Sequence, residues 1–313
     1  MSSKSRKSRS MIKKYELLRP RVAAAQAMAG APSYVRQGSI EVRLARSSRE
    51  IRQAQKLRYQ IFYREMSARP DFKMRALRRD IDPYDSVCDH LLVLDHDRPK
   101  AQRIVGTYRL LRQEVAEAHE GFYSEGEFDL ASLRGTNFKT QMGNGQLLEL
   151  GRSCVHPDYR ANSTINMLWK GIAEYLKQHG IGYMFGCASF PSVDPQEISE
   201  ALSYLYHHHR VPDDFRVSAL ENQFVPMDTI DADDIDVRRA RRALPPLIKG
   251  YLRLGCFIGD GAVIDHQFGT TDVFILLPVE KIASRYLKHY EMTGSDAPAN
   301  DAAVSDGDMA VNA

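Results

Sequence analysis

The sequence predicts a mixed α/β (α+β) fold in which helices flank one central sheet. Apolar and polar residues alternate over 40–44, and the stretches 147–155 and 181–189 have the composition and length of strands. Apolar residues recur at helical spacing over 51–65 and 165–176. Because strand and helix patterns interleave along the chain, we expect helices packed against a single sheet.

The predicted elements follow one another from residue 40 onward. Ser47 and Glu50 have the spacing of a capping box, so the first helix begins there. Gly180 ends the second helix. Asp194 and Pro195 are the expected N-cap and first residue of a third helix over 198–206. The other predicted elements are an irregular segment at 67–89, strands at 90–95 and 103–110, a loop with helical pieces at 112–145, helices at 237–243 and 247–254, a strand at 272–277 and a closing helix at 279–290.

Charge and composition divide the chain into three regions. We expect one domain over 39–290, because 313 residues with 43% hydrophobic content provide a sizeable core. The stretch 1–38 is a basic tail, in which the first 21 residues carry eight Lys and Arg and one Glu. The stretch 291–313 is an acidic tail, expected to be disordered. The basic tail is a candidate for contact with anionic lipid, at about 1 kcal/mol per basic side chain. Nucleic acid is not expected as a partner, because no aromatic residues interleave with these charges.

The cysteines and the hydropathy pattern limit the cellular setting. Cys88, Cys154, Cys187 and Cys256 are scattered without CxxC spacing, which indicates neither a zinc site nor a disulfide framework. No apolar run reaches the length of a membrane span, and the basic N-terminus lacks the apolar core of a secretory signal. We therefore expect a cytoplasmic protein, with peripheral contact at the inner face of the cytoplasmic membrane through its basic tail.

Several charged residues are candidates for a site that binds an amine. Asp82 and Asp85 flank a Pro–Tyr turn, where they either cap backbone amides or form an anionic cup for a cationic substrate. Arg58 and Phe62 share one face of the first helix, so Arg58 needs a carboxylate or a substrate group as partner. Arg109 ends a strand, where it is either exposed or placed to bind a substrate carboxylate bidentately.

Glu149 is the candidate general base. It lies within an apolar strand, where burial would raise its pKa toward neutral pH, although an edge strand would leave it facing water. Strict alternation places Arg152 on the opposite face. A bulge near Gly151 would bring both side chains to one side. A metal site and a serine hydrolase are disfavoured, because the consecutive residues 207–209 suit no metal geometry and Ser153 has no GxSxG context.

The segment after this strand resembles the acyl-CoA-binding core of GNAT acyltransferases. The resemblance rests on strand 147–155, on Asp158-Tyr159-Arg160 and on the following helix. Where that family has a glycine-bearing pyrophosphate loop, this chain has 160–164, which favours a donor on the 4'-phosphopantetheine of acyl carrier protein. The resemblance implies a GNAT-like mixed sheet and no metal or other cofactor. It places the donor against Ser153, Val155, Tyr159, Arg160, Ser163 and Thr164.

Two related families share further residues with the chain. One is the acyl-homoserine-lactone synthases, whose fingerprint is similar to Arg58, Phe62, Asp82, Asp85, Arg109, Glu149 and Arg152. The other is the bacterial ornithine Nα-acyltransferases of ornithine-lipid synthesis, in the hemolysin-like GNAT group, which the chain resembles over roughly 40–285. That second resemblance is carried by the segment 244–255 together with Asp265, Phe268, Gly269 and Asp272.

The second resemblance implies a reaction. A 3-hydroxyacyl group would pass from acyl carrier protein to the α-amine of L-ornithine, giving lyso-ornithine lipid in the first step of ornithine lipid synthesis. Glu149 would accept the proton, and Asp82 and Asp85 would hold the cationic side of the substrate. Arg109 or Arg152 would bind its carboxylate or position the donor. Two alternatives remain: acyl-homoserine-lactone synthesis, and a non-catalytic scaffold that binds carrier protein or lipid.

Overall fold

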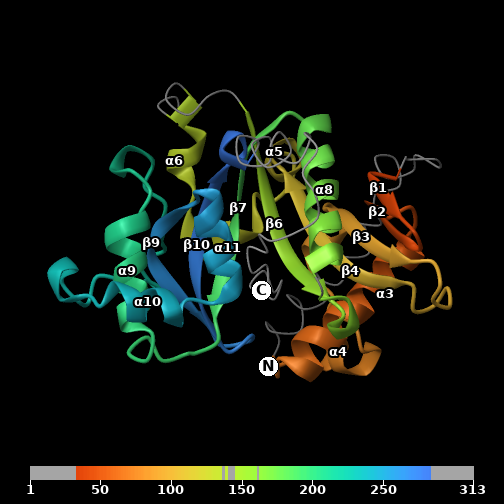
Figure 1. Ribbon diagram of the computed structural model, residues 1–313, viewed down its shortest axis with the longest axis horizontal. Coiled ribbons are helices and arrows are strands. Elements are labelled where there is room, and N and C mark those ends of the chain that lie inside the picture. Colours follow the sequence, from red (N-terminus) through yellow and green to blue (C-terminus); the bar gives the residue numbers. More distant parts are fainter. Residues whose placement is uncertain (1–32, 136–137, 140–144, 161, 283–313) are drawn as a thin grey trace, which may run out of the picture.

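Ten strands form one mixed sheet across the described part of the chain, residues 33–135, 138–139, 145–160 and 162–282 of a computed structural model (Figure 1). Their order is β1-β2-β3-β4-β6-β7-β10-β9-β8-β5. The strands are β1 Val35–Gln37, β2 Ile40–Leu44, β3 Asp89–Asp95, β4 Ile104–Arg112, β5 Phe128–Asp129, β6 Gln146–Val155, β7 Ile181–Phe190, β8 Ser218–Ala219, β9 Phe257–Asp265 and β10 Thr270–Pro278.

Helices cover both faces of this sheet. One face packs against α8, α9, α10 and α11 through a continuous apolar cluster, and Figure 1 shows α8 and α11 in front of the strands. The other face packs against α3 and η1 near β3 and β4, and against the segments between β4 and β6. The α-helices are α3 Ser48–Arg58, α4 Phe72–Leu77, α5 Gln113–Glu117, α6 Ala131–Arg134, α8 Asn162–Gln178, α9 Ser199–His209, α10 Val237–Ala243 and α11 Pro246–Leu254. A π-helical segment, η1 Tyr59–Glu65, continues α3, and the 3₁₀ turns are η2 Pro83–Ser86, η3 Tyr123–Gly126, η4 Pro157–Tyr159, η5 Asp213–Phe215 and η6 Ala232–Asp234.

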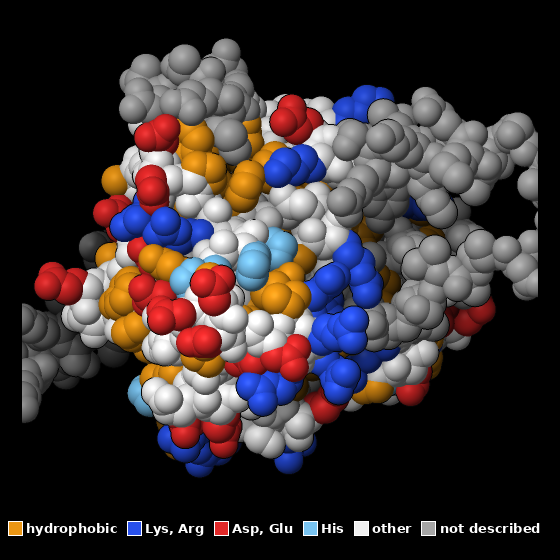
Figure 2. Space-filling model, turned by 60° about the vertical axis from the view of Figure 1, so that its left-hand side comes forward, with side chains coloured by type: hydrophobic (Ala, Val, Ile, Leu, Met, Phe, Trp, Pro, Cys, Tyr) orange, Lys and Arg blue, Asp and Glu red, His pale blue; other side chains and the backbone are white. Residues whose placement is uncertain are grey.

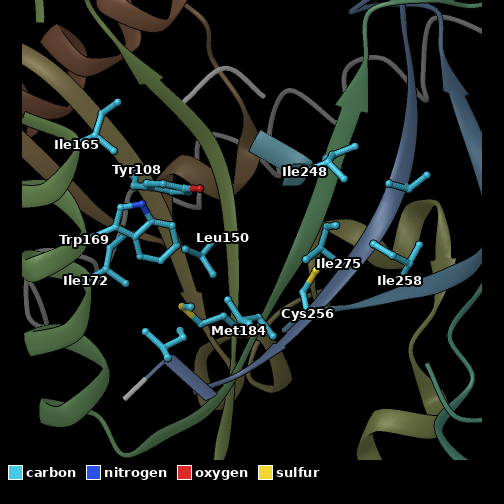
Figure 3. Packing of buried hydrophobic residues seen from close by; sticks show 14 of the residues in the cluster. Tyr108, Leu150, Ile165, Trp169, Ile172, Met184, Ile248, Cys256, Ile258 and Ile275 are labelled. Carbon is cyan, nitrogen blue, oxygen red and sulfur yellow. The ribbon is translucent and has the colours of Figure 1, made fainter. Parts of the chain in front are cut away.

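The sheet opens between β6 and β7. These strands pair in parallel until Glu149 and Phe185, after which β6 stays with β4 and β7 stays with β10. The two backbones are in close contact where the opening begins, because a Cβ on Gly186 would lie 2.4 Å from the carbonyl oxygen of Leu150. Figure 3 shows β6 and β7 diverging from the region of Met184. Among the described residues, the opening leaves one edge of each strand without a partner strand.

A bulge in β6 lies beside this opening. Thr107 pairs with Cys154 and Arg109 with Gly151, so β6 has one residue more than β4 over this stretch. Arg152 lies inside the bulge in the left-handed region, with φ 51°. This confirms the bulge predicted from the sequence.

Most of the predicted elements are confirmed, with four differences. Residues 67–89 include the short helix α4, which Asp71 caps by accepting a hydrogen bond from the amide of Met74 at 2.6 Å. Strand β9 was not predicted, because Gly259 and Gly261 interrupt its apolar pattern. Asp194 caps a turn rather than a helix, since it accepts from the amide of residue 196 while α9 starts only at residue 199. The sheet begins at β1, inside the stretch 1–38 that was assigned to the tail.

Other predictions fall outside the described residues. They are the first 32 residues of the basic tail, most of the closing helix and the acidic tail. No helix within the described ranges is both long and apolar enough to cross a lipid bilayer.

Candidate active site

A pocket fills the opening between β6 and β7. Its empty volume is about 990 Å³, a figure that includes the open mouth. The pocket is lined from both faces of the sheet, because neighbouring residues that line it, such as Tyr108 and Arg109, point to opposite faces. Its apolar part lies on the α8 and α11 face, where Figure 3 shows Tyr108 on one side of the gap and Ile275 on the other. Its polar part lies on the opposite face and is lined by Arg109, Tyr123, Ser124, Glu127, Glu149, Arg152 and Asp272.

Arg109 and Arg152 form the cationic wall of this polar part. The guanidinium carbon of Arg152 lies 5.0 Å from the ring centre of Tyr123 and 4.9 Å from that of Phe268. Arg109 lies 5.2 Å from the ring of Tyr123. Phe62 does not line the pocket, but its ring packs at 5.6 Å against Phe268. Aromatic faces therefore fix both guanidinium groups while leaving them in contact with the pocket.

Behind this wall, Arg58 holds two buried aspartates. It donates to the two carboxylate oxygens of Asp85 at 2.7 Å each, and its Nε lies 2.7 Å from Asp80. Arg58 is fully buried and does not line the pocket, which makes it a structural ion pair. Burial alone would raise the pKa of Asp85, but the charge and hydrogen bonds of Arg58 hold that pKa well below its usual range.

Asp80 and Asp85, together with Asp82, also neutralise the two pocket arginines. Asp82 lies 2.9 Å from Nη1 of Arg109 and 3.3 Å from Nη2 of Arg152. Asp80 lies 3.4 Å from Nε of Arg152, and Asp85 lies 3.6 Å from Nη1 of Arg109. Asp82 and Asp85 therefore do not form the anionic cup expected from the sequence. Their charges are used within the protein, and both lie outside the lining of the pocket.

Glu149 is buried at the start of the opening and lines the pocket. Its Oε2 accepts from the amide of Tyr123 at 2.8 Å, and its Oε1 accepts from the amide and the hydroxyl of Ser124 at 2.7 and 2.5 Å. Burial raises the pKa of Glu149, and the hydrogen bonds from Ser124 and Tyr123 oppose that rise. The carboxylate therefore anchors η3 over the pocket, and Oε2, which accepts one hydrogen bond among the described residues, has the capacity to accept a second.

A second set of carboxylates lines the pocket from the β7 side of the opening. Glu127 follows η3, Asp265 ends β9 and Asp272 belongs to β10. Burial and the nearby charges of Asp272 and Asp265 raise the pKa of Glu127 to about 7. Sequence patterns did not predict Glu127, which lies in a loop. Asp265 and Asp272 were named only as residues shared with a related family. The one local signal was a charged residue at the start of the apolar strand β10.

The apolar part of the pocket contains two tyrosine hydroxyl groups. The hydroxyls of Tyr108 and Tyr251 lie 2.9 Å apart, and both residues line the pocket. Around them are Leu150, Met184, Leu247, Ile275 and Leu277.

Of the residues expected to bind the donor, Ser153 lines the pocket and the others lie beyond it. Val155 is buried at the end of β6. The hydroxyl of Tyr159 donates to Asp95, and Arg160 forms an ion pair with Glu65 at 2.6 Å. In the first turn of α8, Ser163 is exposed and Thr164 is buried.

Replacing Arg58 tests the structural role of the buried network. Arg58→Met leaves Asp80 and Asp85 buried with one fewer cation, so we expect the free energy of unfolding to fall by about 3–5 kcal/mol. Urea denaturation measures this change. Arg160→Met is the control, because it breaks an exposed ion pair and is expected to lower the free energy of unfolding by less than about 1 kcal/mol. Equal losses in the two variants would contradict the structural role.

Comparison with known proteins identifies the family. Residues 57–170 match the family described as the acetyltransferase (GNAT) domain. The L-ornithine N(alpha)-acyltransferase of Brucella abortus is 49% identical over 255 residues, which cover 81% of this chain and 89% of the relative. That of Rhizobium meliloti is 48% identical over 269 residues, which cover 85% and 88% of the two chains. The structure of FeeM, an N-acyl amino acid synthase from uncultured soil microbes, covers 77% of this chain and 91% of its own with 10% identity and a TM-score of 0.42, too distant to support an inference about function. The resemblance stated from the sequence is confirmed: the chain has a GNAT-like fold and belongs to the family of the L-ornithine N(alpha)-acyltransferases.

Proposed function

We propose that this enzyme transfers a 3-hydroxyacyl group from acyl carrier protein to the α-amine of L-ornithine, giving lyso-ornithine lipid in the first step of ornithine lipid synthesis. The observation that carries the proposal is the 49% identity to a relative named L-ornithine N(alpha)-acyltransferase. The pocket supports it, because a polar end with charges of both signs adjoins an apolar end. A zwitterionic acceptor suits the polar end and an acyl chain suits the apolar end.

The proposed reaction is aminolysis of a thioester. Glu149, directly or through one water, accepts a proton from the α-ammonium group and frees its lone pair. The amine attacks the thioester carbonyl, the new C–N bond forms and the C–S bond breaks. The nitrogen then gives up its second excess proton, which passes to the departing phosphopantetheine thiolate, and Glu149 releases the first proton to solvent. Beyond Glu149, no strand in the described part of the chain pairs with β6 on its β7 side. The amides of the stretch from Ser153 to Val155 that point away from β4 are therefore candidates to hold the oxyanion.

Arg152 and Arg109 are the proposed ligands of the acceptor's carboxylate. Both line the pocket, and guanidinium groups bind carboxylates bidentately. The acyl chain then extends into the apolar part of the pocket on the α8 and α11 face. Tyr108 and Tyr251 lie there as hydrogen-bonding partners for the 3-hydroxyl group.

Glu149→Gln tests the general base. We expect the wild type to acylate ornithine and not S-adenosylmethionine when 3-hydroxyacyl carrier protein is the donor. The variant should lose roughly 100-fold or more in kcat, because an amide cannot accept the proton. Mass-spectrometric detection of the N-acyl product measures this rate.

Ser124→Ala is the matched control for that variant. It removes one hydrogen bond to the Glu149 carboxylate but keeps the carboxylate, so most of the activity should remain. Full activity of Glu149→Gln would exclude Glu149 as the base. Turnover of S-adenosylmethionine alone would exclude ornithine acylation.

Helix α10 is the proposed docking surface for the carrier protein. It ends just before α11, whose Leu247 and Tyr251 line the pocket. Arg238, Arg241 and Arg242 are exposed on α10 and form no ion pair within the described residues. Figure 2 looks onto this side of the molecule and shows Lys and Arg side chains grouped together on its surface. A basic surface beside the pocket favours a partner with complementary negative charge.

Charge reversal on α10 should weaken binding of the carrier protein alone. For Arg241→Glu/Arg242→Glu we expect KM for the acylated carrier protein to rise roughly 10-fold at low salt. KM for the same acyl group on free pantetheine should not change. Arg49→Glu/Arg52→Glu, on the exposed side of α3, makes the same charge change away from the pocket and should leave both values unchanged. An equal rise for both donors would contradict docking at α10.

The basic tail, 1–38, is the proposed contact with the inner face of the cytoplasmic membrane. The support is its eight Lys and Arg against one Glu in the first 21 residues. Sedimentation with anionic vesicles should decrease when residues 1–32 are removed and when salt is raised. Equal binding of the shortened protein would contradict this contact.

A further inference from the structure

Glu127, Asp265 and Asp272 differ from the three aspartates behind the arginine wall. Within the described part of the chain, none of the three forms an ion pair with Lys, Arg or His. Asp272 is 7% exposed, and its Oδ1 has no hydrogen-bond partner there. Glu127 accepts a hydrogen bond from the thiol of Cys187 at 3.6 Å, and a thiol is a weak donor. The pocket therefore contains carboxylates that have no ion-pair partner among the described residues.

Such an arrangement is costly unless a ligand neutralises it. Asp272 is buried, and Glu127 and Asp265 are half-buried, with Asp265 accepting from the amides of Gln267 and Phe268 at 2.7 and 3.0 Å. Like charges this close repel one another, and a bound cation would offset that repulsion. Arg152 has its ion pairs with Asp80 and Asp82 and none with these three carboxylates. These three carboxylates and the two arginines therefore form two oppositely charged ends of one polar compartment.

Resting on the function proposed above, we infer that Glu127, Asp265 and Asp272 bind the side-chain ammonium group of the acceptor and so select a diamino acid over neutral amino acids. The acceptor's carboxylate then lies at Arg109 and Arg152, on the β4 and β6 side of the opening. Its α-amine lies between the two ends, on the side of Glu149.

The residues around the carboxylates give this site a pH dependence. Glu127 is faced by Asp272 and Cys187 from the sheet, by Asp265 from the end of β9 and by Arg152 from β6. The pKa of Glu127 is raised to about 7, and burial raises that of Asp272 to about 6 although the hydroxyls of Ser189 and Thr270 oppose the shift. KM for a diamino acid should therefore rise as pH falls below about 7, while KM for a neutral amino acid should lack this change.

Two acceptors separate the roles of the pocket. Ornithine and norvaline share the α-amine, the carboxylate and the three-carbon side chain, and norvaline lacks the terminal ammonium. The wild type should prefer ornithine in kcat/KM. In Glu127→Gln and in Asp272→Asn this value for ornithine should fall roughly 10- to 100-fold, mainly through KM, as expected for losing a charged hydrogen bond. The value for norvaline should stay unchanged.

Asp260→Asn is the matched control. Asp260 is a buried carboxylate on β9 outside the pocket, where it pairs with Arg216 at 3.4 Å, so the variant should keep the preference for ornithine. Equal losses for both acceptors in Glu127→Gln would overturn the inference, as would an unchanged preference. A wild type that acylates neither acceptor would instead count against the proposed function.

Stability gives a second readout that a structural carboxylate would not produce. Because the pKa of Glu127 is raised in the folded protein, its contribution to the free energy of unfolding is fully present at pH values below the ordinary pKa of glutamate. That contribution is lost as pH rises to about 7. Without substrate at pH 8, Glu127→Gln should therefore have a higher Tm than the wild type. A lower Tm would assign Glu127 to the structural framework and overturn its role in binding.

Discussion

The buried network of three arginines and three aspartates is the constraint on which the pocket depends. It joins α3 through Arg58, the 80–85 segment, β4 through Arg109 and β6 through Arg152. Moving ions out of water is costly, so such a network is weak evidence for stability by itself. Its value here is positional. With Asp82 behind them, Arg109 and Arg152 keep their charge and orientation inside a low-dielectric wall and still have N–H groups that reach the pocket.

The bulge in β6 connects this network to the chemistry. A regular strand would direct Arg152 away from Glu149, whereas the extra residue and the left-handed backbone bring it to the face that carries Glu149. Glu149 in turn fixes η3 through the amides of Tyr123 and Ser124. The ring of Tyr123, the first residue of η3, lies against both pocket arginines. Glu127 is the residue that follows η3. The placement of the candidate base, the carboxylate ligands and the acidic end is therefore coupled.

Local patterns were enough to predict the order of most elements, the bulge and the burial of Glu149, because each depends on neighbouring residues. Arg58 was predicted to need a carboxylate or a substrate group as partner, and in the structure its partners are Asp85 and Asp80. The anionic cup was wrong because charge balance depends on residues distant in sequence: Arg152 meets Asp82 across 70 positions. Glu127 could not be predicted for the same reason. The turn before it is held by Glu149, whose carboxylate binds amides 25 and 26 positions away in the sequence. Strand β9 escaped prediction because close packing requires Gly259, whose Cβ would lie 2.8 Å from Phe274.

A site that binds the side-chain ammonium group of the acceptor, as proposed for Glu127, Asp265 and Asp272, has a limited effect on kcat. The α-amine loses its positive charge when the amide forms, but the carboxylate and the side-chain ammonium are the same in substrate, transition state and product. Binding them equally throughout lowers KM without raising kcat, so in the proposed reaction the acidic end serves selection and Glu149 serves the chemical step. The product then has its charged group on one face of the sheet and its acyl chain on the other. Because β6 and β7 pair up to Glu149 and Phe185, the side of the gap beyond these residues is the exit that we propose for this product.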